Sequence, residues 1–106
     1  MSEEVFDMKT QFMVEMFLPE ELEMSFMRMI PAHRAYINEL ISSGQIISYS
    51  ISFDRSKGWI IFLADNAADV LDIVQQFPIH QFITIEIHEL FIHDGEAYRF
   101  PKLNFN

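Results

Sequence analysis

A carboxylate and an imidazole lie two positions apart inside an otherwise apolar stretch of the chain. In "FITIEIHELFI", residues 82–92, Glu86 and His88 interrupt a run of isoleucine, phenylalanine and leucine. Side chains two positions apart on a β-strand point to the same face. A carboxylate and an imidazole on one face can take up and return a proton, which is the chemistry of general acid–base catalysis. The pair therefore predicts a site that moves a proton.

Further polar side chains are expected on the same face of a sheet. If residues 82–92 form a strand, Phe82 and Thr84 share the face of Glu86. A predicted strand at residues 11–18 carries Glu15 on its more polar face. The alternation in "QIISYSISF" puts Ser48 and Ser50 on the less hydrophobic face of another strand. The serine hydroxyls could donate hydrogen bonds to an oxygen that becomes negative during a reaction.

His33 is a second histidine of interest, because it falls between Ile30 and Ile37 on the apolar stripe of a predicted helix. It is either a hydrogen-bonded core residue or a group that contacts a ligand. The catalytic candidates are therefore Glu86, His88 and Glu15, and the substrate-binding candidates are Ser50, Ser48, Thr84, Phe82 and His33.

No metal site or cofactor is expected. His88 and His93 are an odd number of residues apart, so on a regular strand they would point to opposite faces. The chain has no cysteine to supply a thiolate ligand or nucleophile. It has only three glycines and no glycine-rich phosphate loop or nucleophile elbow.

The hydrophobic pattern predicts six elements that position these residues. Strands are expected at 11–18, 45–53, 59–64 and 82–92, and helices at 20–43 and 67–77. The order β-α-β-β-α-β predicts an α+β, ferredoxin-like fold with a four-stranded antiparallel sheet and both helices on one face. In this topology the first and last strands are neighbours, which would bring Glu15 beside Glu86.

Individual residues mark where these elements begin and end. Pro31 should break the first helix and could begin its second segment. Gly44 should close that helix, and the polar loop 54–58 should form a hairpin that ends in glycine. Asp65 or Asn66 should cap the second helix.

With 106 residues the chain is long enough for one domain. We expect a flexible leader at 1–10, the ferredoxin-like domain at 11–93, and a tail at 94–106. The tail contains apolar side chains that we expect to dock on its own or a neighbouring subunit. They are Tyr98, Phe100, Leu103 and Phe105.

The formal net charge of −9 excludes two classes of partner. Nucleic acids and anionic membrane surfaces need clustered lysine and arginine, and the sequence has no basic stripe. No apolar stretch reaches the length of about 18 residues that a membrane-spanning helix needs. The N-terminus lacks the long apolar run of a signal peptide, so a cytoplasmic location is expected.

Eleven phenylalanines and seven methionines are a large apolar content for a small monomer. A homodimer or larger homo-oligomer would bury the excess. Two sheets stacked across a dimer would close an α/β barrel around a cavity for a small-molecule ligand. Two alternatives remain open: a phenylalanine-rich core in a monomer, and acidic and histidine side chains that are merely solvated or ion-paired at an interface.

Two segments carry a resemblance to a known family. "AYINELISSGQI" and "FPIHQFITIEIHEL" resemble the first helix and the last strand of the muconolactone isomerases, small proteins of the dimeric α/β-barrel superfamily. The matching positions are Tyr36, Leu40, Gly44, Pro78, Ile85, Glu86, Leu90 and His93. The resemblance covers about four-fifths of the chain. It implies a homodimer that assembles into larger rings, and Glu86 as the carboxylate that moves a proton.

The sequence departs from the family pattern at positions that concern the substrate. Glu15 stands where the family has a basic residue, and Ser50 and Ile51 stand where it has a Trp-Arg pair. The family substrate is an anionic lactone acid, which a cavity with carboxylates in place of cations should hold poorly. We therefore expect a cofactor-free isomerase for a small cyclic or apolar molecule. The alternatives are a non-catalytic ligand-binding or assembly protein and a cofactor-less monooxygenase of the same superfamily.

Overall fold

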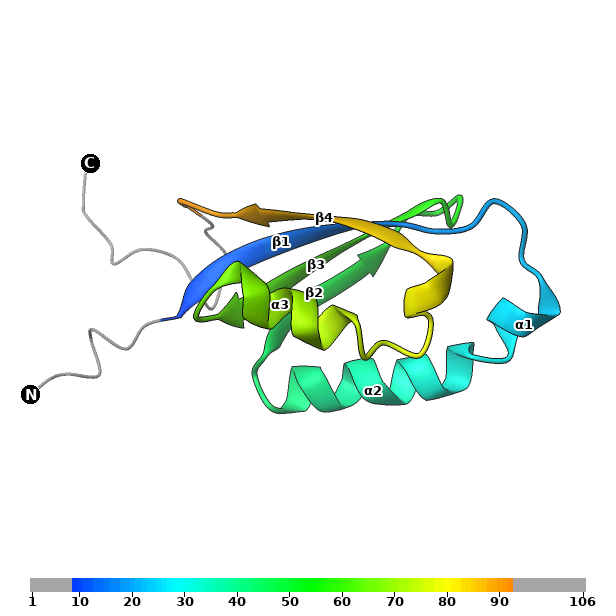
Figure 1. Ribbon diagram of the computed structural model, residues 1–106, viewed down its shortest axis with the longest axis horizontal. Coiled ribbons are helices and arrows are strands. Elements are labelled where there is room, and N and C mark those ends of the chain that lie inside the picture. The colour runs from blue at the N-terminus through cyan, green and yellow to red at the C-terminus, as the bar shows by residue number, and fades with distance from the viewer. Residues whose placement is uncertain (1–8, 93–106) are drawn as a thin grey trace, which may run out of the picture.

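The computed structural model describes residues 9–92 as one antiparallel sheet with helices packed on one face (Figure 1). The strands are β1 (Thr10–Phe17), β2 (Ile46–Ile51), β3 (Lys57–Ala64) and β4 (Thr84–Glu89). The helices are α1 (Met24–Met27), α2 (Ile30–Ser42), α3 (Ala67–Val74) and the short 3₁₀ turn η2 (His80–Phe82). The predicted β-α-β-β-α-β order and the α+β, ferredoxin-like arrangement are confirmed.

The sheet has the order β2-β3-β1-β4, so β1 and β3 are its central strands. Side chains alternate along β1: Phe12, Val14 and Met16 are buried, while the residues between them are only partly buried. This alternation follows from the two-residue period of a strand with one face against the helices. β1 pairs directly with β4, as the topology predicted.

The first helical region begins later than predicted and is broken. Residues 20–22 are not helical, and Glu23 is the N-cap of the four-residue helix α1. A new helix, α2, then starts at Ile30 with Pro31 in its first turn. A proline there loses no hydrogen bond, because the first backbone N–H groups of a helix have no partner inside it. The predicted break at Pro31 is thus confirmed.

Glycine closes α2 as predicted. Gly44 has φ of +84°, its N–H donates to Ile41 O over 3.0 Å, and the N–H of Gln45 donates to Leu40 O over 3.0 Å. These two bonds form a Schellman motif, which needs a residue with positive φ at this position. The cap of α3 was predicted as Asp65 or Asn66. It is Asn66, whose side-chain oxygen accepts from the N–H of Asp69 at 2.9 Å.

Two details of the β2–β3 hairpin were not predicted. The register shifts between Ile46 and Ser48, so that Ile46 and Tyr49 both lie on the helix side. Such a bulge inserts one extra residue, here Ile47, and interrupts the simple alternation. The left-handed residue of the turn is Arg55, with φ of +64°, and Gly58 lies inside β3 rather than in the loop.

The core lies between the sheet and the helices. Its buried members come from every major element: Phe12, Val14, Met16, Phe26, Ile37, Leu40, Ile46, Ile60, Phe62, Ala64, Val70, Val74, Phe77 and Ile79. The helix-facing isoleucines of β4, Ile85 and Ile87, pack against this cluster. Leu22, Met29 and Ile41, three apolar residues of the segment predicted as the first helix, are exposed.

Residues 1–8 of the predicted leader lie outside the described residues, and so does the whole of the predicted tail, 94–106. Among the residues that the structure describes, no helix combines the length and the apolar composition needed to cross a membrane.

Candidate functional site

The outer face of the sheet, the side away from the helices, carries a row of residues that crosses all four strands. Glu15 of β1 lies directly opposite Glu86 of β4 on one side and opposite Trp59 of β3 on the other. Trp59 in turn lies opposite Ser50 of β2. Partners directly opposite in an antiparallel pair point to the same face. Two strands from opposite ends of the described chain thus place two carboxylates side by side.

His88 lies next to this carboxylate pair. Its Nε2 is 3.6 Å from Oε1 of Glu86, and its strand partner is Met13. The ligand atoms of Glu15, Glu86 and His88 all lie within 4.8 Å of one another. The structure therefore brings together the three residues predicted as catalytic.

One cation compensates part of the negative charge. Two carboxylates directly opposite each other on a sheet repel and destabilise the pair. Lys57 Nζ lies 3.4 Å from Oε2 of Glu15, and the same ammonium lies 5.3 Å from the centre of the Phe17 ring. The Glu15 side chain is 23% exposed, whereas that of Glu86 is 60% exposed. Glu86 is therefore the carboxylate that solvent or a ligand reaches more easily.

The three groups also form a set that could hold a divalent cation. Two carboxylate oxygens and an imidazole nitrogen are common ligands of Zn²⁺ and related ions. No metal site was predicted from the sequence, because His88 and His93 would point to opposite faces of a regular strand. The combination with Glu15 was not visible from spacing, since it depends on which strands are neighbours.

Three of the predicted binding residues also lie on the outer face. Thr84 is opposite Phe17, and Ser50 and Ser48 are opposite Trp59 and Ile61. All three polar residues are exposed. Their hydroxyls therefore lie on the same side of the sheet as Glu86.

Phe82 does not share this face, and its predicted place on the last strand is wrong. β4 begins at Thr84, and Phe82 belongs to η2. Its ring packs edge-on against Phe26, with 5.4 Å between ring centres. The strand was predicted too long because "FITIEI" is apolar throughout, and periodicity alone does not locate the end of such a run.

His33 lies on the other side of the sheet, within the core. It is 2% exposed, and its Nε2 is 2.8 Å from the hydroxyl of Tyr49. Burial, with a smaller effect from the charge of Arg34, lowers the pKa of His33 from 6.5 to about 4. The interpretation of His33 as a hydrogen-bonded core residue is confirmed, and the structure does not bring it near Glu86.

Trp59 and Lys57 are the outer-face residues that sequence reasoning missed. β3 was predicted to begin at Trp59 and was treated as a uniformly apolar central strand. In the structure it begins at Lys57, and its two-residue alternation sends Lys57 and Trp59 outward. The sequence did contain a signal for Trp59. If residues are paired outward from the β2–β3 turn, Ser50 falls opposite Trp59, so the two side chains share a face.

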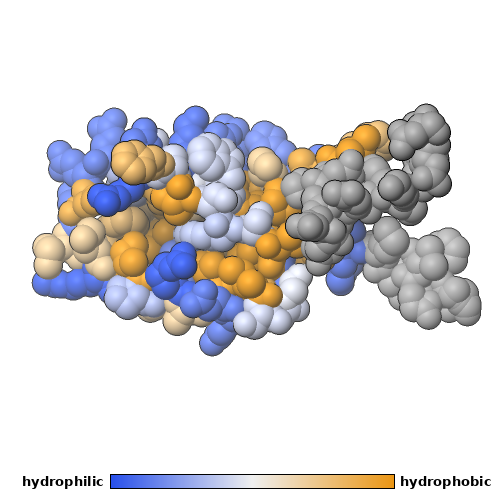
Figure 2. Space-filling view, turned by 180° about the vertical axis from the view of Figure 1, so that it is seen from behind, coloured by the Kyte–Doolittle hydropathy of each residue, from blue (hydrophilic) through white to orange (hydrophobic). Residues whose placement is uncertain are grey.

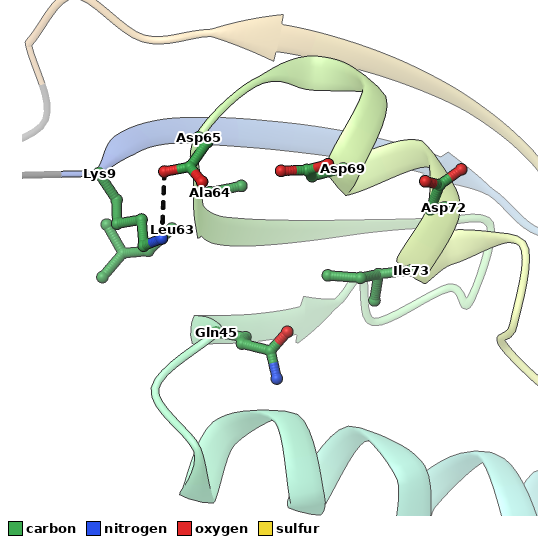
Figure 3. Close-up of a pocket in the computed structure, with 8 residues that line it drawn as sticks. All are labelled: Lys9, Gln45, Leu63, Ala64, Asp65, Asp69, Asp72 and Ile73. Atoms are coloured by element: carbon green, nitrogen blue, oxygen red, sulfur yellow. Dashed lines mark hydrogen bonds and ion pairs between the residues drawn. The ribbon is translucent and has the colours of Figure 1, made fainter.

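A separate hollow of about 330 Å³ lies beside α3 at the opposite end of the strands from the β2–β3 turn (Figure 3). Asp65, Asp69 and Asp72 line it, together with Lys9, whose ammonium is 3.1 Å from the Asp65 carboxylate. None of the catalytic or substrate-binding candidates predicted from the sequence lines this hollow. Its carboxylates come from the α3 region and are exposed, so it is separate from the Glu15–Glu86 pair.

Comparison with known proteins agrees with this architecture. No curated protein matches the chain. The model of one protein family does match it, that of muconolactone delta-isomerase, over residues 8–96. The match includes all four strands and both major helices, and with them Glu15, Glu86 and His88. The chain therefore belongs to the muconolactone delta-isomerase family.

Proposed function

We propose that the protein is a cofactor-free isomerase that moves a proton within a small cyclic or apolar molecule. The observation that carries the proposal is the pairing of Glu15 with Glu86 across β1 and β4, with His88 at 3.6 Å from Glu86. A carboxylate with a neighbouring acid and an imidazole can take a proton from carbon and return it elsewhere. Membership of the family supports this class of chemistry.

The proposal requires that the outer face be covered, and we propose that a second copy of the chain covers it. Five apolar side chains of the central strands point outward: Met13, Phe17, Trp59, Ile61 and Leu63. Seen from behind, hydrophobic side chains gather across the middle of the molecule between polar margins (Figure 2). The family is oligomeric, which fits a homo-oligomer. Desolvation under a partner sheet would raise the pKa of a carboxyl group towards the range useful for proton transfer.

In the proposed reaction, Glu86 is the general base. It removes a proton from a carbon next to a carbonyl group, and the electron pair of that C–H bond moves into the carbonyl to form an enolate-like oxygen. Thr84, which lies two positions from Glu86 on the same face of β4, donates a hydrogen bond to that oxygen, whereas Ser48 and Ser50 lie three strands away on β2. The same proton then returns to a different carbon, and the double bond shifts. His88 orients Glu86, and Lys57 pairs with Glu15 beside it.

A second candidate is a protein that binds a small ligand on the same face without catalysis. It is favoured by Glu15, Ser50 and Ile51, which replace a basic residue and a Trp-Arg pair of the family. A family member that has lost these groups can keep the fold while it loses the reaction.

The two candidates differ in one measurable property. An uncharged β,γ-unsaturated butenolide should be converted to its conjugated isomer by the wild-type protein, and ultraviolet absorbance follows the conjugation. Glu86→Gln should lower the rate by about 100-fold or more, the usual contribution of a general base. Glu89→Gln is the matched control, because Glu89 is on the same strand and opposite Phe12, on the other face.

Equal rates for wild type and Glu86→Gln would contradict the isomerase proposal. Binding of the butenolide without any acceleration by the wild type would support the binding protein instead.

A further inference from the structure

A groove of about 380 Å³ lies on the helix side of the sheet, at the end where α1, the start of α2 and the β2–β3 turn meet. Its volume is within the range of about 300–1,000 Å³ that small-molecule sites occupy. The residues that line it are Leu18, Leu22, Phe26, Met27, Ile30, Arg34, Ile51, Arg55 and Ile79. None of them was predicted as a site residue, and none belongs to the outer face.

The lining has only two kinds of side chain. Seven are apolar, and six of these seven are aliphatic or thioether groups rather than aromatic rings. The other two are guanidinium groups. Among the residues that the structure describes, no carboxylate, hydroxyl or amide side chain lines the groove. A molecule bound here would find apolar walls for a chain and two guanidinium groups for one charged end, but no neutral hydrogen-bonding side chains for scattered ring oxygens.

The two arginines stand out in a chain of net charge −9. Residues 9–92 contain three arginines, Arg28, Arg34 and Arg55, and two of them line this groove. Arg34 is held over the ring of Tyr49, with 5.6 Å from its guanidinium carbon to the ring centre. Neither Arg34 nor Arg55 forms an ion pair with another described residue.

The carboxylate closest in sequence to Arg55 makes its hydrogen bonds through Oδ1 to serine residues and not to Arg55. Asp54 accepts hydrogen bonds from the hydroxyls of Ser52 and Ser56 at 2.7 and 2.8 Å, and from the N–H of Ser56 at 3.0 Å. Asp54 and Glu20 line a neighbouring hollow that Arg55 also borders, not the groove itself. The positive charge of the groove is therefore available to an anion.

We infer that this groove binds an aliphatic monocarboxylate, such as a medium-chain fatty-acid anion. The carboxylate would pair with Arg34 and Arg55, whose planar guanidinium groups match a carboxylate with two hydrogen bonds. The alkyl chain would lie against the isoleucine and leucine walls and gain free energy with each methylene removed from water.

The inference is independent of the proposed isomerase reaction. The groove is on the helix side of the sheet and Glu86 is on the outer side, so either site can exist without the other. Loss of proton transfer in Glu86→Gln would leave fatty-acid binding unchanged.

The test uses the full chain and three probes: hexanoate, octanoate and the uncharged 1-octanol. Isothermal titration should show that octanoate binds roughly tenfold more tightly than hexanoate, because two methylenes are added. It should also bind about tenfold more tightly than 1-octanol, because the carboxylate pairs with guanidinium groups. Methyl NMR should show the largest shifts at Ile30 and Ile51, which line the groove.

Three variants localise the site. Arg34→Gln and Arg55→Gly should each weaken octanoate binding by about tenfold and leave 1-octanol binding unchanged. Glycine is chosen at position 55 because φ is +64° there, so the substitution relieves the backbone. Arg28→Gln is the control, since Arg28 is an exposed arginine at the end of α1 that does not line the groove.

Equal affinity for octanoate and 1-octanol would overturn the inference, as would equal loss in Arg28→Gln. Absence of octanoate binding, or NMR shifts confined to other residues, would do the same. A groove filled by a second copy of the chain would appear as absence of binding in the oligomer.

Discussion

At the scale of single residues, chemistry depends on which side of the sheet a side chain occupies. Glu86 and His33 are both polar residues in apolar segments, but Glu86 lies on the exposed outer face and His33 lies in the core. The buried imidazole has its Nε2 beside the hydroxyl of Tyr49, and its Nδ1 has no hydrogen-bond partner within residues 9–92. Because the ring of His33 is buried and only one of its nitrogens is hydrogen-bonded, the charged form of His33 is disfavoured.

This burial predicts a pH dependence of stability. The pKa of His33 falls from 6.5 to about 4 on folding, so between these values the unfolded chain binds more protons than the folded one. Stability should therefore be constant above pH 6.5, with respect to this residue, and fall by roughly 1–3 kcal/mol as pH drops from 6.5 to 4. Urea unfolding at several pH values measures it. His33→Leu should remove this part of the slope, and identical slopes in the two proteins would contradict the prediction.

Asp54 provides a second prediction at the residue scale. Hydrogen bonds from the Ser52 side chain, the backbone of Ser56 and the Ser56 side chain lower the pKa of Asp54 from 3.8 to about 2. Its contribution to stability is thus present above pH 3.8 and is lost as pH falls towards 2. Ser52→Ala should raise the pKa of Asp54 towards 3.8 in a carboxyl-carbon NMR titration. An unchanged pKa in that variant would show that the hydroxyl is not responsible.

At the scale of the elements, glycines hold the hairpin and the end of α2 in place for different reasons. Gly58 lies in β3 opposite Ile51, where a Cβ atom would meet Met16 Cε at 2.6 Å and Ile51 Cδ1 at 2.9 Å. Gly44 has open space around it, but its φ of +84° is unfavourable for other residues. One position therefore excludes a side chain for lack of room and the other for backbone conformation.

These two reasons predict different outcomes for alanine. Gly58→Ala should destabilise the protein by about 1–3 kcal/mol, because the neighbouring side chains and the Ser50 carbonyl at 3.1 Å must shift. Gly44→Ala should cost about 1 kcal/mol, because only the Schellman conformation is strained. Chemical denaturation measures both. A Gly58→Ala protein with the wild-type unfolding midpoint would show that Met16 and Ile51 adapt without cost.

At the scale of the whole molecule, helices cover one face of the sheet, and within residues 9–92 no helix or strand covers the other. The uncovered face combines Met13, Trp59 and Leu63 with the carboxylate pair, a mixture that suits an interface better than a free surface. The predicted homodimer places this face against its own copy. In the proposed homodimer, the second copy would enclose Glu86.

A charge in the middle of this face should therefore prevent assembly. Met13→Lys, at the centre of β1 and opposite Ile61 and His88, should convert the homo-oligomer to smaller species in light scattering coupled to gel filtration. Gln76→Lys introduces the same charge just after α3, on the helix side, and should leave the mass unchanged. A wild-type protein that is monomeric would refute both the interface and the enclosed site.

Much of the architecture follows from local patterns. The elements and their order were predicted from the alternation in residues 11–18 and from the helix-boundary residues Pro31, Gly44 and Asn66. Both signals are local, because hydrophobic periodicity and helix capping depend on neighbouring residues in the sequence. The predicted strand boundaries and faces were wrong where the local sequence signals were weak. Phe82 was assigned to a strand because its neighbours are apolar, and the bulge at Ile47 reversed part of the expected alternation of β2.

The sequence by itself determined which residues can move a proton and which side of each strand carries them. It also placed Glu15 and Glu86 on neighbouring strands through the element order. Only the tertiary structure decided that the two carboxylates are directly opposite, that Lys57 and His88 flank them, and that Arg34 and Arg55 line one groove. The physical reason is that strand register and the approach of distant turns depend on packing across the whole core, which no local stretch of sequence contains.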